Sequence, residues 1–278
     1  MSRREAAKLS IVTPRHELNE SRRARRTVST RQHSSVAVFI CCSDSRKDIL
    51  ARVLPSILNF WPDCPYPIYV GVNSARGISP GVTPLTAEQG GWRKECSAQV
   101  AQIRATHLIV ILDDFLFQGP VDQAKVSQLV HEAIASDISY LRLIPLGKSL
   151  FERISKKNGE NTAGAINQIH EKRPFYSCLQ IALWEKKHFE AMLKLDGSIW
   201  DFEHQRLIDV PHFTITDRSP FKYRHLIEKG RWLPNAKSLL HNAGLPTDLG
   251  YRPRWTMLRS LHLLVDHLKL IVLGYANH

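Results

Sequence analysis

Four short apolar runs separated by amphipathic stretches dominate the first half of the chain. Continuous apolar runs of this length are typical of strands buried on both faces. The runs are Val36–Ile40, Ile68–Val72, His107–Leu112 and Tyr140–Ile144. The stretches between them predict helices: one capped by Asp44 with Ile49, Leu50, Val53 and Ile57 on one face, one over 92–104 and one over 121–136. Strands and helices alternating in this way predict a mostly parallel α/β sheet with flanking helices and crossover connections.

This alternation stops beyond residue 175, and we expect the second half of the chain to lie against the first. Two polar stretches, 74–91 and 155–170, are predicted loops, the first long enough to be functional. Near the C-terminus, apolar residues at helical spacing from Met257 to Tyr275 predict an amphipathic helix, either docked on the domain or lying in a membrane interface. The predicted organisation is a basic tail over 1–34, an α/β domain over 35–245 and a C-terminal helix over 246–278.

The net charge of the chain predicts an anionic partner. The formal net charge is +12, and residues 1–33 hold nine Lys and Arg against three acids, which is half of the excess. The segment is interpreted either as a disordered tail or as a tether to an anionic membrane surface. Nucleic acid is not an expected partner, because no aromatic side chains are interleaved with the basic ones and no recognition motif follows. No apolar run reaches the roughly 18 residues that span a bilayer.

The cysteines indicate a reducing compartment. Cys41, Cys42, Cys64, Cys96 and Cys178 form no C-x-x-C pair and show no zinc-ligand spacing. We interpret all five as reduced and structural, which predicts a cytoplasmic protein, peripheral at the inner membrane if the tail binds lipid.

The candidate chemistry centres on two adjacent carboxylates, Asp113 and Asp114, directly after the third apolar run. Neighbouring like charges at a partly buried strand end repel each other and need compensation, which Mn²⁺ or Mg²⁺ could supply. Ligands of open α/β sheets bind beyond the carboxyl ends of the strands. Ser43 and Asp44 follow the first run and Asn73 the second, so they would share that edge and could contact a nucleoside. The alternative is a solvated turn that caps the next helix.

A second cluster lies downstream, at Tyr176, Gln180, Trp184 and Trp200. An indole ring suits stacking on a sugar, so these four residues are candidate acceptor contacts. Asp201 and Glu203 are candidate general bases for an acceptor hydroxyl, and only one of them would face the site if the segment is helical. The alternative is that the aromatic rings belong to the core and the acids to a solvated helical turn.

These residues resemble a known family. The run Val110–Phe115, with its Asp-Asp-Phe end, resembles the Asp-x-Asp metal motif of GT-A-fold glycosyltransferases. The segments Tyr176–Trp184, Trp200–Glu203 and Tyr223–Trp232 are similar to bacterial enzymes that build lipopolysaccharide, O-antigen or capsule. The resemblance covers about residues 35–245, and the third carboxylate of the motif is absent.

The resemblance implies a metal-dependent transferase that moves a sugar from a nucleotide-sugar donor to a glycan or glycolipid acceptor, with inversion. Asp113 and Asp114 would hold a metal-diphosphate group, and Asp44 and Asn73 would lie near the nucleoside. In such enzymes a histidine from the C-terminal part of the domain is often a further metal ligand. Of the candidates His212, His225 and His241, we choose His225. Glu203, or failing it Asp201, would be the base. Arg224, Lys229 and Arg231 could neutralise the diphosphate or form a solvated loop.

Two other functions remain open from the sequence. One is a nucleotide-sugar-binding protein without turnover on the same scaffold. The other is a sugar nucleotidyltransferase, although the Gly-rich phosphate loop expected after the first strand is missing from Ser43–Arg46.

Overall fold

The computed structural model describes residues 35–146, 165–171, 176–205, 207, 210–256 and 265. All of them fall within one compact unit that begins at Ser34. Most of the predicted C-terminal helix and the whole basic tail lie outside the described residues. Residues 246–256, which we assigned to the C-terminal helix, are irregular apart from a turn at Gly250 and Tyr251, and Arg254 bridges to Trp232.

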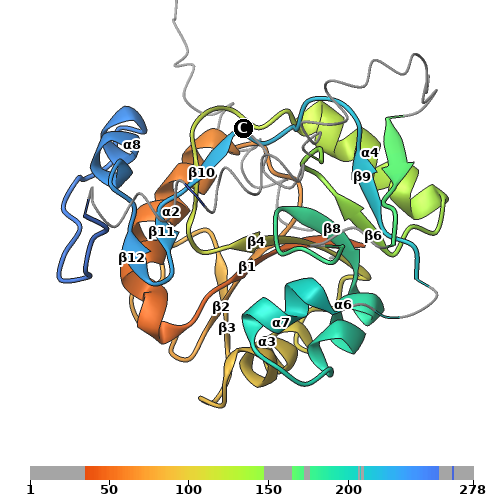
Figure 1. Ribbon diagram of the computed structural model, residues 1–278, viewed down its shortest axis with the longest axis horizontal. Helices are drawn as coiled ribbons and strands as arrows, with labels where there is room; N and C mark the ends of the chain where they lie inside the picture. Colours follow the sequence, from red (N-terminus) through yellow and green to blue (C-terminus); the bar gives the residue numbers. More distant parts are fainter. Residues whose placement is uncertain are drawn as a thin grey trace, which may run out of the picture. The chain divides into compact units, whose positions relative to one another are not determined.

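One eight-stranded mixed sheet organises the described residues, in the order β3-β2-β1-β4-β8-β6-β9-β7 (Figure 1). The strands are β1 (Val36–Cys41), β2 (Ile68–Val72), β3 (Thr83–Thr86), β4 (His107–Leu112), β6 (Tyr140–Arg142), β7 (Ile166–Gln168), β8 (Ala182–Glu185) and β9 (Phe213–Ile215). Strands β3, β2, β1 and β4 are parallel, as are β6 and β9, whereas β8 is antiparallel to β4 and β6, and β7 to β9. The predicted α/β class with a mostly parallel sheet is confirmed.

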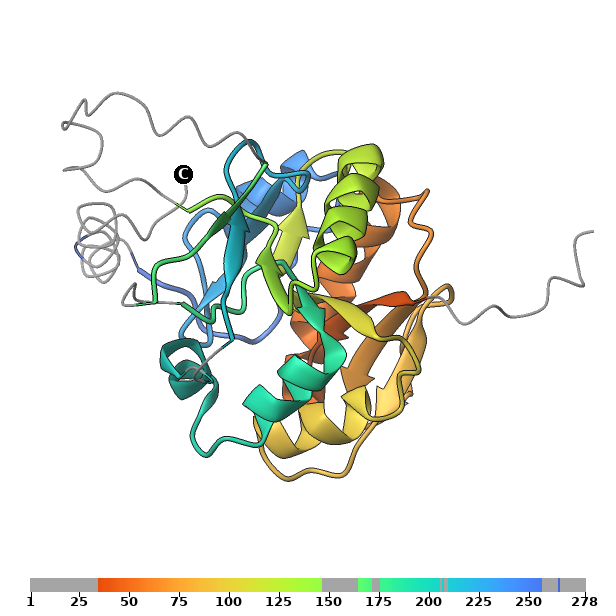
Figure 2. The same cartoon turned by 90° about the vertical axis from the view of Figure 1, so that its right-hand side faces the viewer.

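Helices cover both faces of this sheet (Figures 1 and 2). Helices α2 (Lys47–Phe60) and α4 (Gln123–Ala135) bury their apolar sides in one core cluster, and α3 (Trp92–Val100), α6 (Lys186–Leu193) and α7 (Ile199–His204) in the other. Smaller elements complete the fold: the 3₁₀ turn η2 (Asp44–Arg46), the pair β5 (Phe115–Phe117) and β10 (Tyr223–His225), the pair β11 (Ile227–Glu228) and β12 (Arg231–Trp232), and α8 (Ala236–Asn242).

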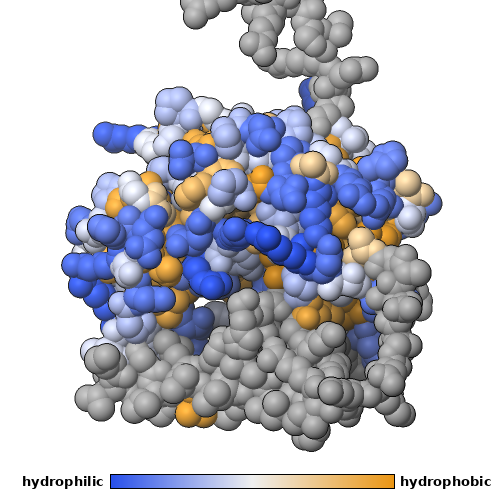
Figure 3. All heavy atoms as spheres, turned by 90° about the horizontal axis from the view of Figure 1, so that it is seen from above, coloured by the Kyte–Doolittle hydropathy of each residue, from blue (hydrophilic) through white to orange (hydrophobic). Residues whose placement is uncertain are grey.

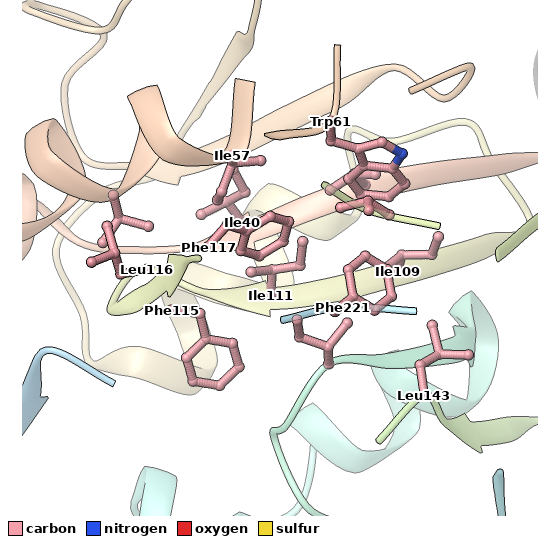
Figure 4. Close-up of a cluster of buried hydrophobic side chains, with 14 of the residues drawn as sticks. Ile40, Ile57, Trp61, Ile109, Ile111, Phe115, Leu116, Phe117, Leu143 and Phe221 are labelled. Carbon is pink, nitrogen blue, oxygen red and sulfur yellow. The ribbon is translucent and has the colours of Figure 1, made fainter. Parts of the chain in front are cut away.

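Successive side chains along a strand point to opposite faces of the sheet, so the core is divided into two clusters, one on each face. In β1, Val36, Val38 and Ile40 pack into the cluster beside α2, whereas Ala37, Phe39 and Cys41 pack into the cluster beside α3. All six residues are buried, because successive side chains point to opposite faces and both faces are covered. Figure 4 shows the first cluster, where residues of α2 and β5 meet Ile109 and Ile111 of β4. The strand ends are therefore held rigidly, and they carry the candidate site.

Four predictions need correction, and the first is the loop predicted over 155–170, which contains β7. The loop predicted over 74–91 contains β3, which tolerates Pro84 because it is the edge strand of the sheet. The helix predicted to reach Arg104 ends at Val100. Asp44 does not cap α2: the carboxylate instead accepts hydrogen bonds from the backbone of Asn73 and Ser74.

The surface and the cysteines complete the description. Hydrophilic residues predominate among the described residues on the face in Figure 3, with apolar ones scattered between them. Among the described helices, none combines the length and apolar character that a bilayer crossing requires. All five cysteines have free thiols.

Candidate functional site at the carboxyl edge of the sheet

The candidate site is built where the parallel strands end. Strands β1, β2, β4 and β6 run in one direction, so their carboxyl ends share an edge. At this edge η2 follows β1, Asn73 follows β2, Asp113 and Asp114 follow β4, and Arg142 ends β6. The predicted approach of Asp44 and Asn73 is present in the structure.

Asp113 is neutralised by an arginine of the protein itself. Its side chain is almost completely buried, and Asp114 is only slightly more accessible. Arg46 donates from Nε to both carboxylate oxygens of Asp113, at 2.9 and 2.7 Å, and from Nη2 to Oδ1 at 2.5 Å. The same Nη2 lies 3.8 Å from Asp114. The compensating charge that the two carboxylates require is thus supplied by η2, because this turn projects Arg46 across the end of β4.

Asp114 faces His225 instead. Strand β10 pairs with β5 so that His225 lies opposite Phe115, the residue after Asp114. His225 Nδ1 is 3.4 Å from Asp114 Oδ2, and the backbone N–H of Leu226 donates to the Asp114 carbonyl at 3.1 Å. Burial disfavours the charged imidazole, but the hydrogen bond and the charge of Asp114 outweigh it and raise the pKa of His225. His225, the predicted metal ligand, thus lies beside Asp114.

The carboxylate pair does not present a ready set of metal ligands. A divalent cation needs several oxygen or imidazole ligands with available lone pairs. Both Asp113 oxygens accept from Arg46, whose positive charge lies where a cation would have to approach. Within the described residues, no three His, Cys, Asp or Glu side chains are grouped closely enough to hold a metal. The residues in this arrangement do not fit Mn²⁺ or Mg²⁺.

Asp44 and Asn73 bind each other. The Asp44 N–H donates to Asn73 Oδ1 at 3.0 Å, and the Asn73 N–H donates to Asp44 Oδ1 at 2.7 Å. The Asn73 amide also donates to Ala87 O and Glu95 Oε2. Ser43 Oγ lies 2.9 Å from Ser45 Oγ. These contacts hold the loops after β1 and β2 together, so the Asn73 amide is engaged within the protein.

Glu203 and Asp201 have different environments. The Glu203 carboxylate accepts a hydrogen bond from Leu179 N at 3.0 Å, which holds it beside the start of β8 and therefore at the site edge. Burial raises the pKa of Glu203, outweighing the lowering effects of Leu179 and of the Arg142 and His225 charges. Asp201 is exposed and forms the capping box of α7 with Ser198, whose hydrogen bonds lower the pKa of Asp201. Asp201 is therefore explained as a helix cap rather than as a base.

The four predicted acceptor contacts also differ in burial: some belong to the core and others are accessible or lie at the site edge. Trp184 is fully buried between Tyr140, Phe189 and Phe202, so its ring belongs to the core and is not available to a sugar. Tyr176 is buried as well, stacked on His212 with its hydroxyl bonded to Val210 O. By contrast, Trp200 is 58% exposed. Gln180 lies at the site edge and accepts from Arg142.

Two site residues were missed from the sequence, and both are arginines. Arg142 lies within a predicted buried strand, and a charged side chain in an otherwise apolar run is the signal that could have identified it. Arg46 gave no comparable signal, because a basic residue in the first turn of a predicted helix is unremarkable in sequence. Its role depends on the crossing of η2 over β4, which only the fold determines.

Comparison with known proteins gives partial structural likenesses. No family model matches the sequence, and no curated protein matches it. The structure of S. aureus TarS 1–349 overlaps 68% of this chain at 11% identity with a TM-score of 0.39, and that of its complex with UDP overlaps 68% at 12% and 0.39. The chain covers 59% and 58% of the length of these two.

A 4-diphosphocytidyl-2C-methyl-D-erythritol synthase overlaps 75% of this chain and 98% of its own length, at 12% identity with a TM-score of 0.45. At this level of likeness none of these structures assigns an activity or a ligand to this chain.

Proposed function

We propose that this chain is a glycosyltransferase that moves a sugar from a nucleotide-sugar donor to a glycan or glycolipid acceptor in bacterial surface polysaccharide synthesis. The observation that carries the proposal is Glu203, a largely buried carboxylate with a raised pKa at the carboxyl edge of an α/β sheet. General bases work best when their pKa lies near the operating pH, and burial is the usual way to raise that of a glutamate.

In the proposed reaction Glu203 accepts the proton of an acceptor hydroxyl. The oxygen then attacks the anomeric carbon of the donor, and the bond to the nucleoside diphosphate breaks with its electron pair leaving on the diphosphate. Attack from the side opposite the leaving group inverts the anomeric centre. His225 is held next to Asp114, which raises the pKa of the imidazole, and the protonated form of His225 would stabilise the departing anion.

Trp200 is the proposed acceptor platform. Its ring is exposed, and it lies in α7, the helix that also carries Glu203. A sugar stacked there would be presented close to the base by the same helix. Mn²⁺ or Mg²⁺ was implied by the resemblance, but no step of this reaction passes through a metal, since Arg46 already neutralises Asp113. The cytoplasmic face of the inner membrane is the proposed location.

The test is sugar transfer by the full chain with a panel of uridine, guanosine and thymidine diphosphate sugars. Glu203→Gln should lower transfer by about 10²–10⁴-fold, because the amide cannot accept the proton, while donor affinity stays similar. Glu132→Gln, on the outer face of α4, is the control for a lost carboxylate. Full transfer by Glu203→Gln would exclude this residue as the base.

A binding protein without turnover is the alternative, and the Arg46–Asp113 ion pair favours it. An arginine fixed on the carboxylate takes the place of a catalytic metal, whereas a nucleotide sugar could bind without one. Calorimetry with the same nucleotides, with and without Mn²⁺, separates the two functions. Binding without either transfer or hydrolysis of any donor would support the alternative.

A further inference from the structure

Two buried arginines in this fold differ in how well they are paired. Arg93 donates from Nε to Gly197 O at 2.8 Å, from Nη1 to Met192 O at 2.6 Å and from Nη2 to Gln205 Oε1 at 2.6 Å. It ties α3 to the segment that leads into α7. Arg142 is only 3% exposed, less than the 9% of Arg93, yet its one hydrogen bond within the described residues runs from Nη2 to Gln180 Oε1.

Arg142 has a buried donor that finds no partner in the part of the chain that the structure describes. Among the described residues three buried side-chain atoms have no hydrogen-bond partner: Gln99 Oε1, Trp184 Nε1 and Arg142 Nε. Of these, only Arg142 belongs to a charged group. No carboxylate of the described residues forms an ion pair with Arg142. The charge of Arg142 acts on the pKa of the nearby Glu203, but the Glu203 carboxylate accepts its hydrogen bond from Leu179 N. A buried guanidinium that has no counter-ion among the described residues is costly for the fold, so its retention needs another explanation.

The position of Arg142 suggests what the counter-ion is. It ends β6 at the same edge as the carboxylate pair, on the opposite side of β4 from Asp44 and Asn73. A ligand extended along this edge from the β2 end would bring its far end to Arg142. The Nε–H belongs to the edge of the guanidinium that matches two oxygens of a phosphate or carboxylate.

We propose that Arg142, oriented by Gln180, binds an oxyanion of the substrate, a phosphate or a carboxylate. The identity of that substrate rests on the proposed function: Arg142 would recognise the donor diphosphate, an acidic donor sugar or a phosphate-bearing acceptor. Oxyanion binding itself does not depend on transferase activity. It is therefore tested first with pyrophosphate, which carries the shared chemistry alone.

The first experiment compares thermal unfolding of the full chain and of Arg142→Met, with and without sodium pyrophosphate at matched ionic strength. Pyrophosphate should raise the Tm of the unchanged chain, and calorimetry should show at least tenfold weaker binding by Arg142→Met. Without ligand, the Tm of Arg142→Met should equal or exceed that of the unchanged chain, because an unpaired buried charge is removed. The basic tail is the same in both chains, so non-specific binding to it cancels.

Arg93→Met is the matched control. It removes a buried arginine whose hydrogen bonds are all made within the protein, so its Tm should fall while the pyrophosphate response stays. A fall in the Tm of Arg142→Met like that of Arg93→Met, or an unchanged response to pyrophosphate, would overturn the proposal. If Arg142→Met does not fold, Arg142→Lys keeps the charge without the planar fork and should bind pyrophosphate more weakly; equal binding would again overturn it.

Three ligand pairs then identify the source of the oxyanion. Weaker binding of a nucleoside diphosphate, but not of the nucleoside, to Arg142→Met assigns the residue to the donor diphosphate. Weaker binding of a nucleotide uronic acid, but not of the matching neutral sugar nucleotide, assigns it to a sugar carboxylate. Weaker binding of a phosphorylated glycan, but not of the unphosphorylated one, assigns it to the acceptor. Pyrophosphate binding through Arg142 in a chain that binds no nucleotide would retain oxyanion binding and reject the proposed function.

Discussion

At the scale of single residues, the ion pair with Arg46 offsets the free-energy cost of burying the Asp113 carboxylate. Arg46→Met should lower the free energy of unfolding by about 3 kcal/mol, at the low end for a broken buried pair because a third of the Arg46 side chain is exposed. Urea unfolding measures the change. The double variant Arg46→Met, Asp113→Asn should recover part of the loss, because no buried charge is then left unpaired. Equal losses in both variants would mean that the ion pair is not the cause.

The same pair bears on metal binding. Arg46→Gln removes the positive charge that lies against the carboxylates and leaves Asp113 and Asp114 as adjacent charges without that partner. We expect this variant to bind Mn²⁺ more tightly than the unchanged chain, which electron paramagnetic resonance of free Mn²⁺ would detect. Arg76→Gln, exposed in the loop after β2, serves as the control for lost positive charge. Tighter binding by the unchanged chain than by Arg46→Gln would contradict this assignment.

The two tryptophans of the downstream cluster should separate stability from binding. Trp184→Ala should cost about 3–5 kcal/mol of unfolding free energy, because it opens a cavity among packed aromatic rings. Trp200→Ala should leave stability within about 0.5 kcal/mol and weaken acceptor binding, since its ring is exposed. Chemical denaturation and acceptor titrations measure the two effects. An acceptor affinity unchanged by Trp200→Ala would remove this residue from the site.

At the scale of elements, a pair of histidines in the core joins α6 to His212, the residue directly before β9. His188 Nε2 lies 2.9 Å from His212 Nε2, and His212 Nδ1 lies 3.0 Å from the Tyr176 carbonyl. The carbonyl can only accept, so Nδ1 of His212 carries a proton, and Nε2 accepts from His188. Burial lowers the pKa of both histidines to about 4. Two neutral rings therefore bridge the second core cluster.

This pair predicts loss of stability in acid. The unfolded chain takes up protons near the ordinary histidine pKa of about 6.5, but the folded chain does so only near 4. The contribution is complete above pH 6.5 and is lost as the pH falls from there towards 4, by up to about 3 kcal/mol for each histidine. Urea unfolding between pH 7 and 4 measures the slope. His188→Gln keeps a donor for His212 and should reduce that slope; an unchanged slope would contradict the assignment.

How far the sequence predicts the elements depends on what determines each of them. Strands β2 and β4 have the predicted limits because continuous apolar runs between polar residues are local signals. Strand β3 was missed because Thr83–Thr86 is short, contains a proline and gains its strand character from pairing with β2. The site was predictable where residues follow strands, as with Asp114, but not where burial decides, as with Trp184 and Arg142.

At the scale of the whole molecule, the basic excess predicts membrane attraction through residues 1–33, which lie outside the described residues. Deleting them should weaken sedimentation with anionic vesicles, with each basic side chain near the surface contributing roughly 1 kcal/mol. Neutral vesicles are the control, and transfer to a soluble acceptor should persist. Unchanged sedimentation with anionic vesicles would exclude this role for the segment.

The pairing of β5 with β10 has a consequence for how the site comes into being. Asp114 and His225 are 111 positions apart in the chain, although their side chains meet. At typical synthesis rates of about 5–20 residues per second, roughly ten seconds separate the appearance of the two residues. A nascent chain that ends before β10 holds the carboxylate pair without its histidine. The contact between Asp114 and His225 therefore forms only after β10 has been made, when the central strands can already pair.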